Sequence, residues 1–283
     1  MRFVGDDEVS DVLLGDARAY IDYLADNIRA IAVGERRAWI KPKVIHEDPV
    51  HPRDGDIRAM TCFTDRVKVV KIISTNPVRQ KHWSVSVGTT LLLDYEENHP
   101  VMQFDAPMMS ALRTAGMAVV GTRFAGYGFG DVCIVGNGRV GRCTRDLVER
   151  AYPEERVPVM RDRVDGTADD RTRYDNEVVI TATTSREPFI TADNCQAGFL
   201  CSLGADTAFN FELSDDCIRT RGGLYVDCND AREVGDLARL GEAEVRGDVL
   251  EFARTGEGMA RTLISVGSPL MDALTVEFLL NHL

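Results

Sequence analysis

The chain has 283 residues, with 33 Lys or Arg against 45 Asp or Glu, so its net charge is −12 at pH 7. With 44% hydrophobic and 28% charged residues, the composition is that of a globular protein and excludes a disordered, collagen-like or membrane-embedded chain. An acidic chain repels phosphate backbones, and no apolar run approaches the roughly 20 residues of a membrane helix, so we expect no nucleic-acid or membrane partner.

The first part of the chain predicts a helix, a sheet and a second helix. Apolar residues recur at helical spacing over residues 9–33, and Gly34 ends the run. Short β-rich runs separated by turn residues then predict an antiparallel sheet or a small barrel: VKVVKII, SVSVGTTLLLDY and HPVMQF. We expect the second helix over about residues 107–120.

After the glycine-rich segment AGYGFG, strands alternate with helices or loops. We expect strands at VCIVG, RVPVM, EVVITATT, GFLCSLGAD and, as the last, LYVDCND, with helices over about 142–151 and at PLMDALTVEFLLNHL. Such alternation predicts a mostly parallel sheet. The predicted fold is α/β, with an α+β domain over 1–120, a Rossmann-type domain over 121–264, and residues 265–283 packing back on the first domain.

The most specific local motif is GxGxxG, directly after the strand VCIVG and directly before a helix. Gly136 allows a tight turn, Gly138 lets the backbone approach a pyrophosphate, and Gly141 lets helix and strand pack closely. The helix N-terminus supplies N–H groups and a partial positive charge. The turn therefore predicts dinucleotide binding by Gly136, Asn137, Gly138, Arg139 and Val140, the alternative being a glycine-rich structural turn.

The end of the second strand bears on the choice of cofactor. An NAD enzyme usually has an acidic residue there to accept from the ribose 2′-OH, whereas this chain has Arg161, Asp162 and Arg163. Arg161 and Arg163 would attract a 2′-phosphate, which favours NADP over NAD. Asp162 could still bind a ribose, and both arginines could be solvated loop charges.

The cysteine, histidine and N-terminal residues indicate a reduced, cytoplasmic protein without a metal. The seven cysteines are odd in number and form no CxxC pair, which fits reduced thiols. The segment HEDPVH carries possible ligands, but its prolines place it in a loop without a second ligand cluster, so we expect no metal site. The start, MRFVGDDEVSD, lacks the basic and apolar regions of a signal peptide.

Six segments in order resemble the ornithine cyclodeaminase/μ-crystallin family of NAD(P)-dependent enzymes. They are VKIISTNP at 70–77, SALRTAG at 110–116, GNG at 136–138, TATTSREP at 181–188, GAD at 204–206 with EL at 212–213, and SVG at 265–267. The resemblance implies a homodimer whose first domain, with the C-terminal helix, binds the substrate and forms the dimer. It also implies cofactor contacts from Thr114, Thr181, Thr183 and Val266.

Family members oxidise or reduce the C–N bond of α-amino acids, amino-acid conjugates or cyclic imines, and some cyclise ornithine or lysine with loss of ammonia. Lys43, Lys71 and Arg113 are basic residues in apolar surroundings and would bind a substrate carboxylate, the alternative being an internal ion pair with a residue such as Asp105. Asp206 follows an apolar strand and, with Lys71, would exchange protons as a catalytic residue, although an Asp there is often a turn or cap residue.

Two departures from the family pattern affect the functional prediction. Only DRVDGTADDRTRYDN separates the second strand from EVVITATT, so the Rossmann domain looks trimmed and its cofactor competence is open. Arg58 stands where the cyclodeaminase branch has a glutamate, and an arginine cannot act as an acid or base at neutral pH.

We therefore rank simple redox chemistry above cyclodeamination. Within the family, the sequence most resembles the aminocarboxyethyl-glutamate dehydrogenase and ketimine reductase-like branch. Arg58 could bind a second substrate carboxylate or could be an exposed residue at a strand end. The alternatives are an ornithine- or lysine-type cyclodeaminase and a non-catalytic, crystallin-like protein that binds NADP.

Overall fold

The computed structural model describes residues 1–47, 55–75, 86–162, 172–240 and 243–283. The chain divides into two compact units, one made of residues 1–113 and 268–283 and the other of residues 114–267. Helix α3, Ala106–Phe124, begins in the first unit and ends in the second. Within the described ranges, no helix has both the length and the apolar character needed to cross a membrane.

The first unit is built on a sheet with the order β1-β7-β6-β5-β4-β2, to which β3 adds by pairing with β4. All its pairs are antiparallel except β1 with β7. The strands are β1 Arg2–Val4, β2 Ala38–Ile40, β3 Val44–Glu47, β4 Asp56–Thr64, β5 Lys68–Thr75, β6 Ser86–Leu93 and β7 Pro100–Asp105. Side chains of β4 and β5 alternate between buried and more exposed positions, as a sheet with one covered face requires.

The single helix predicted over residues 9–33 is wrong in one respect, because the structure has two helices there. Helix α1 spans Asp6–Gly15 and α2 spans Ala17–Ala32. Asp16 leaves the helical conformation, and its carboxylate accepts a hydrogen bond from the Ala19 N–H as the N-cap of α2. The apolar spacing continues across this break, which is why periodicity alone does not reveal it.

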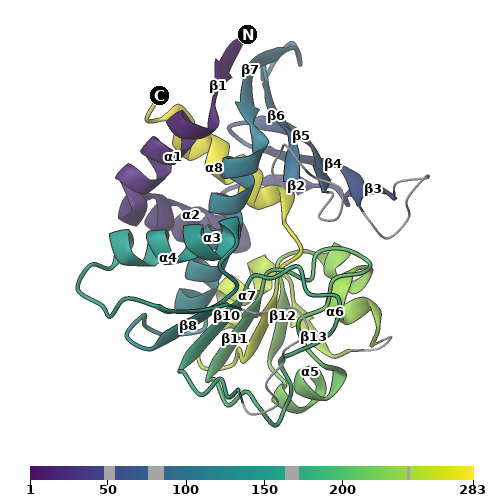
Figure 1. The fold of residues 1–283 in the computed structure, drawn as a ribbon. Coiled ribbons are helices and arrows are strands. Elements are labelled where there is room, and N and C mark those ends of the chain that lie inside the picture. The colour runs from purple at the N-terminus through teal and green to yellow at the C-terminus, as the bar shows by residue number, and fades with distance from the viewer. Residues whose placement is uncertain (48–54, 76–85, 163–171, 241–242) are drawn as a thin grey trace. The chain divides into compact units, whose positions relative to one another are not determined.

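Helix α8, Pro269–Leu280, packs against β4, β5 and α2 in the core of the first unit (Figure 1). Ser268 caps it by accepting from the Leu270 N–H. Every residue from Pro269 to Leu279 is buried, as expected for a helix that is apolar on all sides. Two of these buried residues, Asp272 and Glu277, are acidic and must therefore find partners within the core.

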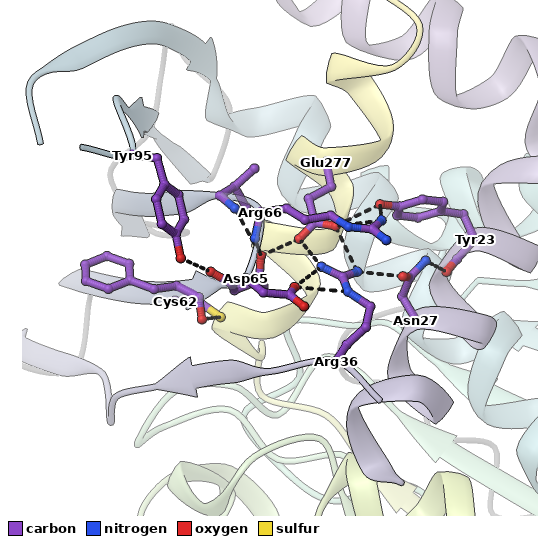
Figure 2. A network of polar contacts seen from close by, with 11 residues as sticks. Tyr23, Asn27, Arg36, Cys62, Asp65, Arg66, Tyr95 and Glu277 are labelled. Atoms are coloured by element: carbon purple, nitrogen blue, oxygen red, sulfur yellow. Dashed lines mark hydrogen bonds and ion pairs between the residues drawn. The ribbon is translucent and has the colours of Figure 1, made fainter. Parts of the chain in front are cut away.

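Glu277 is the centre of a polar network in the first unit (Figure 2). Its carboxylate accepts from Arg36 Nη1 at 3.0 Å and Nη2 at 3.1 Å, from the Tyr23 hydroxyl at 2.8 Å, and from the Thr64 hydroxyl. Arg36 also donates to Asp65 at 2.6 Å. Both oxygens of Glu277 are thus well supplied with donors.

The second unit contains a sheet whose strands are all parallel, in the order β13-β12-β14-β11-β10-β8-β9, so the predicted parallel sheet is confirmed (Figure 1). The strands are β8 Val132–Val135, β9 Val159–Arg161, β10 Val178–Thr181, β11 Phe199–Ser202, β12 Leu224–Val226, β13 Val245–Gly247 and β14 Thr262–Ile264. The described helices beside α3 are α4 Arg139–Ala151, α5 Asp215–Arg221, η1 Asn229–Arg232, α6 Gly235–Ala238 and α7 Val249–Thr255.

The prediction that LYVDCND is the last strand is wrong. Two further strands, β13 and β14, follow it, and β14 lies between β12 and β11. Each has only three residues, and β14 is placed by its pairing with β11 and β12 rather than by a pattern of its own.

Candidate functional site

The glycine-rich turn of the second unit joins β8 to α4, as the sequence predicts. Gly136 has a φ of 114°, and a Cβ there would come within 2.3 Å of the Ala182 carbonyl oxygen. A Cβ on Gly141 would come within 1.8 Å of the Gly136 carbonyl oxygen. Neither position can carry a side chain, so both glycines are required by the turn itself.

Gly138 differs from these two glycines because nothing lies within 4 Å of the position its Cβ would occupy. It is the N-cap of α4, and no side chain caps this helix. The first N–H groups of α4 are therefore not engaged by a capping side chain, and the space beside Gly138 is open. Together with Asn137, Arg139 and Val140, which are all at least partly accessible, this arrangement fits the pyrophosphate of a dinucleotide.

Arg161 lies at the carboxyl end of β9, the neighbour of β8. Its carbonyl oxygen accepts from the Gly136 N–H at 2.8 Å, which ties this strand end to the glycine-rich turn. Its guanidinium donates to the Arg173 carbonyl oxygen at 2.9 Å and lies 5.6 Å from the centre of the Tyr174 ring. Asp162 is exposed, and Arg163 lies outside the described residues.

Glu212 is buried at the carboxyl ends of β10 and β11 and accepts five hydrogen bonds. Oε1 accepts from the Thr183 N–H at 2.7 Å and the Thr183 hydroxyl at 2.8 Å. Oε2 accepts from Thr181 at 2.7 Å, from Ser202 at 2.9 Å and from the Gly204 N–H at 2.8 Å. The hydroxyls of Thr181 and Thr183 are thus bound to Glu212, and a contact of these residues with a cofactor stays a prediction.

A second buried acid, Asp236, lies beside Glu212. Its Oδ1 accepts from the N–H groups of Glu212 at 2.9 Å and Leu213 at 3.2 Å, and its Oδ2 from Ser202. Burial raises the pKa of Glu212, because the charged form loses its hydration. Burial, aided by the charge of Glu212, raises the pKa of Asp236 to about 7.

Asp206 follows β11 at its carboxyl end, where open parallel sheets bind ligands. It is half-buried. The turn before it requires a glycine at position 204, because a Cβ there would come within 2.0 Å of the Thr183 carbonyl oxygen. The predicted position of Asp206 is therefore found, whereas its catalytic role stays a prediction.

Another carboxylate, Asp227, holds the SVG segment at the end of β14. It accepts from the Ser265 hydroxyl at 2.7 Å and from the N–H groups of Val266 at 3.1 Å and Gly267 at 2.8 Å. The Val266 backbone is thereby fixed. Thr114, the other predicted cofactor contact, is buried on α3.

In the first unit, Lys71 and Arg113 share one carboxylate. Lys71 Nζ lies 2.9 Å and Arg113 Nε 3.2 Å from the same oxygen of Asp272, Oδ1. Burial lowers the pKa of Lys71 to about 8, with Arg113 and Arg58 lowering it further and Asp272 opposing the shift. The internal partner is therefore Asp272 rather than Asp105, the residue suggested from the sequence, and two cations with one anion leave one positive charge.

The two other predicted cations of the first unit are also buried. Arg58 lies within β4 and donates to Asp56 from Nε at 3.0 Å and from Nη2 at 2.8 Å. Arg58 is thus buried within a strand and is not an exposed residue at a strand end. Asp56 balances its charge inside the unit. Lys43 is buried between β2 and β3.

Sequence reasoning gave no role to Asp272, Glu212, Asp227 and Asp56. The available signal is the same for the first three: a single acid inside a short apolar segment, in PLMDAL, FNFEL and LYVDC. An ionised side chain in such a segment needs buried partners, which makes it a candidate for holding loops or cations in place.

The family model described as the ornithine cyclodeaminase/mu-crystallin family matches residues 8–173, more than half of the chain. The chain belongs to this family. A curated relative, N-((2S)-2-amino-2-carboxyethyl)-L-glutamate dehydrogenase of Staphylococcus aureus (strain NCTC 8325 / PS 47), is 26% identical over 215 residues. This match covers 66% of the chain and 63%, less than two thirds, of that relative.

Two solved structures share the fold. Thermococcus litoralis Δ1-pyrroline-2-carboxylate reductase, in complex with NADH and L-proline, has a TM-score of 0.80 at 18% identity and covers 100% of this chain and 98% of its own. An archaeal alanine dehydrogenase dimer with bound NAD also has a TM-score of 0.80 at 18% identity, covering 99% and 95%. Both likenesses support the α/β fold predicted for this chain, with a parallel sheet in one unit and an α+β arrangement in the other.

Proposed function

We propose that the protein is an NAD(P)-dependent oxidoreductase acting on the C–N bond of an α-amino acid, an amino-acid conjugate or an imine. The observation that carries the proposal is that buried Lys71 and Arg113 share a single carboxylate, in a chain that also has an open dinucleotide-type turn at Gly138. The remaining positive charge suits one substrate carboxylate. The glutamate-conjugate dehydrogenase among the relatives supports the same chemistry.

The cofactor would be held by Gly136, Asn137, Gly138, Arg139 and Val140 at the N-terminus of α4, and it would supply hydride acceptance or donation. Arg161 supports a preference for NADP, since it ends the strand next to the turn and can place a positive charge near a 2′-phosphate. We therefore propose NADP rather than NAD as the preferred cofactor.

The substrate side of the reaction is assigned to the first unit's cations and to Asp206. Lys71 and Arg113 bind the substrate carboxylate, and Asp206 exchanges a proton with the substrate nitrogen, with Lys71 as a second proton carrier. Lys43 and Arg58 are the two further basic residues that we assign to substrate binding. Because Arg58 is already balanced by Asp56, we give it a part in choosing the substrate rather than in the chemistry.

The test is a panel of amino acids, keto acids with amines, and cyclic imines, monitored at about 340 nm, where reduced nicotinamides absorb. Asp206→Asn should lower kcat by about 10²–10⁴ with cofactor affinity little changed, because it removes proton exchange but keeps the shape. Arg113→Met should mainly raise KM, because it removes binding shared by ground and transition states.

Other outcomes would replace the proposal. Ammonia release from ornithine or lysine without net change at 340 nm would indicate a cyclodeaminase. Tight cofactor binding without turnover of any compound would indicate a crystallin-like binding protein. A kcat unchanged in Asp206→Asn would remove that residue from the chemistry.

We further propose a cytoplasmic homodimer. The seven free cysteines support a reducing compartment. The sheet of the first unit carries apolar side chains on its uncovered face, since Val44 is 53%, Ile57 53% and Ile72 47% exposed. The register aligns Val44 with Ala59 and Ala59 with Ile72, so Val44, Ala59 and Ile72 form a row across β3, β4 and β5. A second copy of the chain would bury such a row.

The dimer is tested by sedimentation velocity. Ile72→Lys should convert a dimer to a monomer, because it places a charge in this apolar row. The matched control is Val157→Lys, an exposed apolar residue of the second unit, which should leave the dimer intact. A monomeric wild type, or a dimer retained in Ile72→Lys, would contradict this interface.

A further inference from the structure

Asp272 holds an unusual position for a buried acid. One of its oxygens, Oδ1, contacts cations from two different elements, Lys71 on β5 and Arg113 on α3. Within the described residues, its other oxygen, Oδ2, is buried without a hydrogen-bond partner. Among the described residues the carboxylate is therefore held by these two cations alone, although a buried carboxylate normally has hydrogen bonds to both oxygens.

The neighbours of the cluster share this feature. Thr90 pairs with Lys71 across β6 and β5, and Ser110 precedes Arg113 by one turn on α3. The hydroxyl oxygens of both are buried without a partner among the described residues. Unsatisfied polar atoms thus gather around Lys71 and Arg113, which is a pattern of functional sites rather than of structural ion pairs.

Glu277, on the same helix, provides the contrast. It is equally buried, and both of its oxygens accept hydrogen bonds, from Arg36, Thr64 and Tyr23. A carboxylate selected only for stability would be surrounded in this way. Among the described residues, Asp272 instead has one oxygen without a hydrogen bond, and its other oxygen contacts the two cations predicted to bind the substrate.

From this arrangement we infer that Asp272 is the positioning residue of the carboxylate clamp: it keeps Lys71 protonated and fixes Lys71 and Arg113 in one geometry for a carboxylate-bearing substrate. The inference rests on the proposed function for the identity of the ligand. The charged and titratable groups around Lys71 are Asp272 on α8, Arg113 on α3 and Arg58 on β4. Tyr20 on α2 and Cys62 on β4 interact electrostatically with Asp272 itself.

The charge balance gives the direction of the effect. Burial and the two arginines favour neutral Lys71, whereas Asp272 favours the ammonium form. If Asp272 becomes Asn, the shape is kept while the negative charge is lost. Lys71 then releases its proton at lower pH, and the clamp loses one of its two cations at neutral pH.

The first experiment measures Lys71 directly and does not depend on activity. The chain has five lysines, so ¹³Cε-lysine labelling gives a spectrum simple enough to titrate, with the Lys71 resonance identified by its loss in Lys71→Arg. Lys71 should titrate at lower pH in Asp272→Asn than in the wild type and should be restored toward the wild-type value in Asp272→Glu. In the control Glu277→Gln, the Lys71 titration should be unchanged.

The second experiment compares kcat/KM over pH in the same variants. The ratio of wild type to Asp272→Asn should grow by about tenfold per pH unit in the range where only the variant has lost the Lys71 proton. A merely structural role would lower activity by the same factor at every pH, as expected for Glu277→Gln. An unmoved Lys71 titration in a folded Asp272→Asn variant overturns the inference, as does a titration in Asp272→Glu that is lowered as far as in Asp272→Asn. Absence of any turnover with a shifted titration overturns the proposed function alone.

Discussion

Replacement of Gly138 by Val separates cofactor binding from folding. The φ of −71° and ψ of −174° at Gly138 suit any residue, and no atom lies within 4 Å of the site of a Cβ. The substitution should therefore cost at most about 1 kcal/mol of stability, from placing a poor N-cap residue at the start of α4. The side chain would instead occupy the space through which a pyrophosphate reaches the helix.

The loss of affinity can be sized from the bonds at stake. A hydrogen bond to a charged group contributes about 1.5–3 kcal/mol, so displacing a pyrophosphate from two N–H groups should cost about 3–6 kcal/mol. At about 1.4 kcal/mol per factor of ten, the dissociation constants for both NAD and NADP should rise by about 10²–10⁴.

The assay is isothermal titration calorimetry with NAD and NADP, combined with thermal unfolding of the same samples. Gly15→Val is the matched neutral control, since it also has open space around the Cβ position but lies in α1. Gly141→Ala is the opposite control: its Cβ would come within 1.8 Å of a backbone oxygen, so it should unfold at a clearly lower temperature. Unchanged dissociation constants in Gly138→Val would refute the assignment of this turn to the cofactor.

Two further predictions concern the second unit. Arg161→Asp should weaken NADP more than NAD by about 1–3 kcal/mol, because it replaces a phosphate partner with a like charge, and an unaltered preference in calorimetry would remove the 2′-phosphate assignment. Because Asp236 has a folded pKa of about 7 against an ordinary 3.8, the folded state holds a proton that the unfolded state has released, so stability should fall as pH rises from about 4 to about 7. Urea unfolding at several pH values should show a shallower decline in Asp236→Asn, and equal slopes would contradict the raised pKa.

Much of the fold could be predicted from the sequence because many of its elements coincide with a clear local pattern of apolar residues or glycines. The glycine-rich turn, α8 and the buried strands β8, β10 and β11 each have a signal that one rule reads without knowledge of the rest of the chain. The misplaced features are those that a local pattern does not encode. Asp16 breaks a helix whose apolar stripe continues, and β14 is a strand only because β11 and β12 flank it.

The candidate site was predicted in part, and the limit has a physical reason. Lys71 and Arg113 stand out because a cation in an apolar segment needs an anion. The anion is about 160 to 200 positions away in the chain, at Asp272, and no spacing rule connects such residues. Glu212 was likewise part of a family motif, but its five donors come from the ends of two strands, β10 and β11, that are about 20 residues apart in the sequence.

The return of the chain to its first unit has a consequence for biosynthesis. Arg36, Lys71 and Arg113 are made early, yet the acids that pair with them in the core, Glu277 and Asp272, lie on α8. Until residues 268–283 leave the ribosome, the first unit would have to bury three cations without these partners. The second unit, by contrast, is one uninterrupted stretch of chain. We therefore expect the nucleotide-type sheet to form first during translation, with the clamp for the substrate assembled only when the last helix arrives.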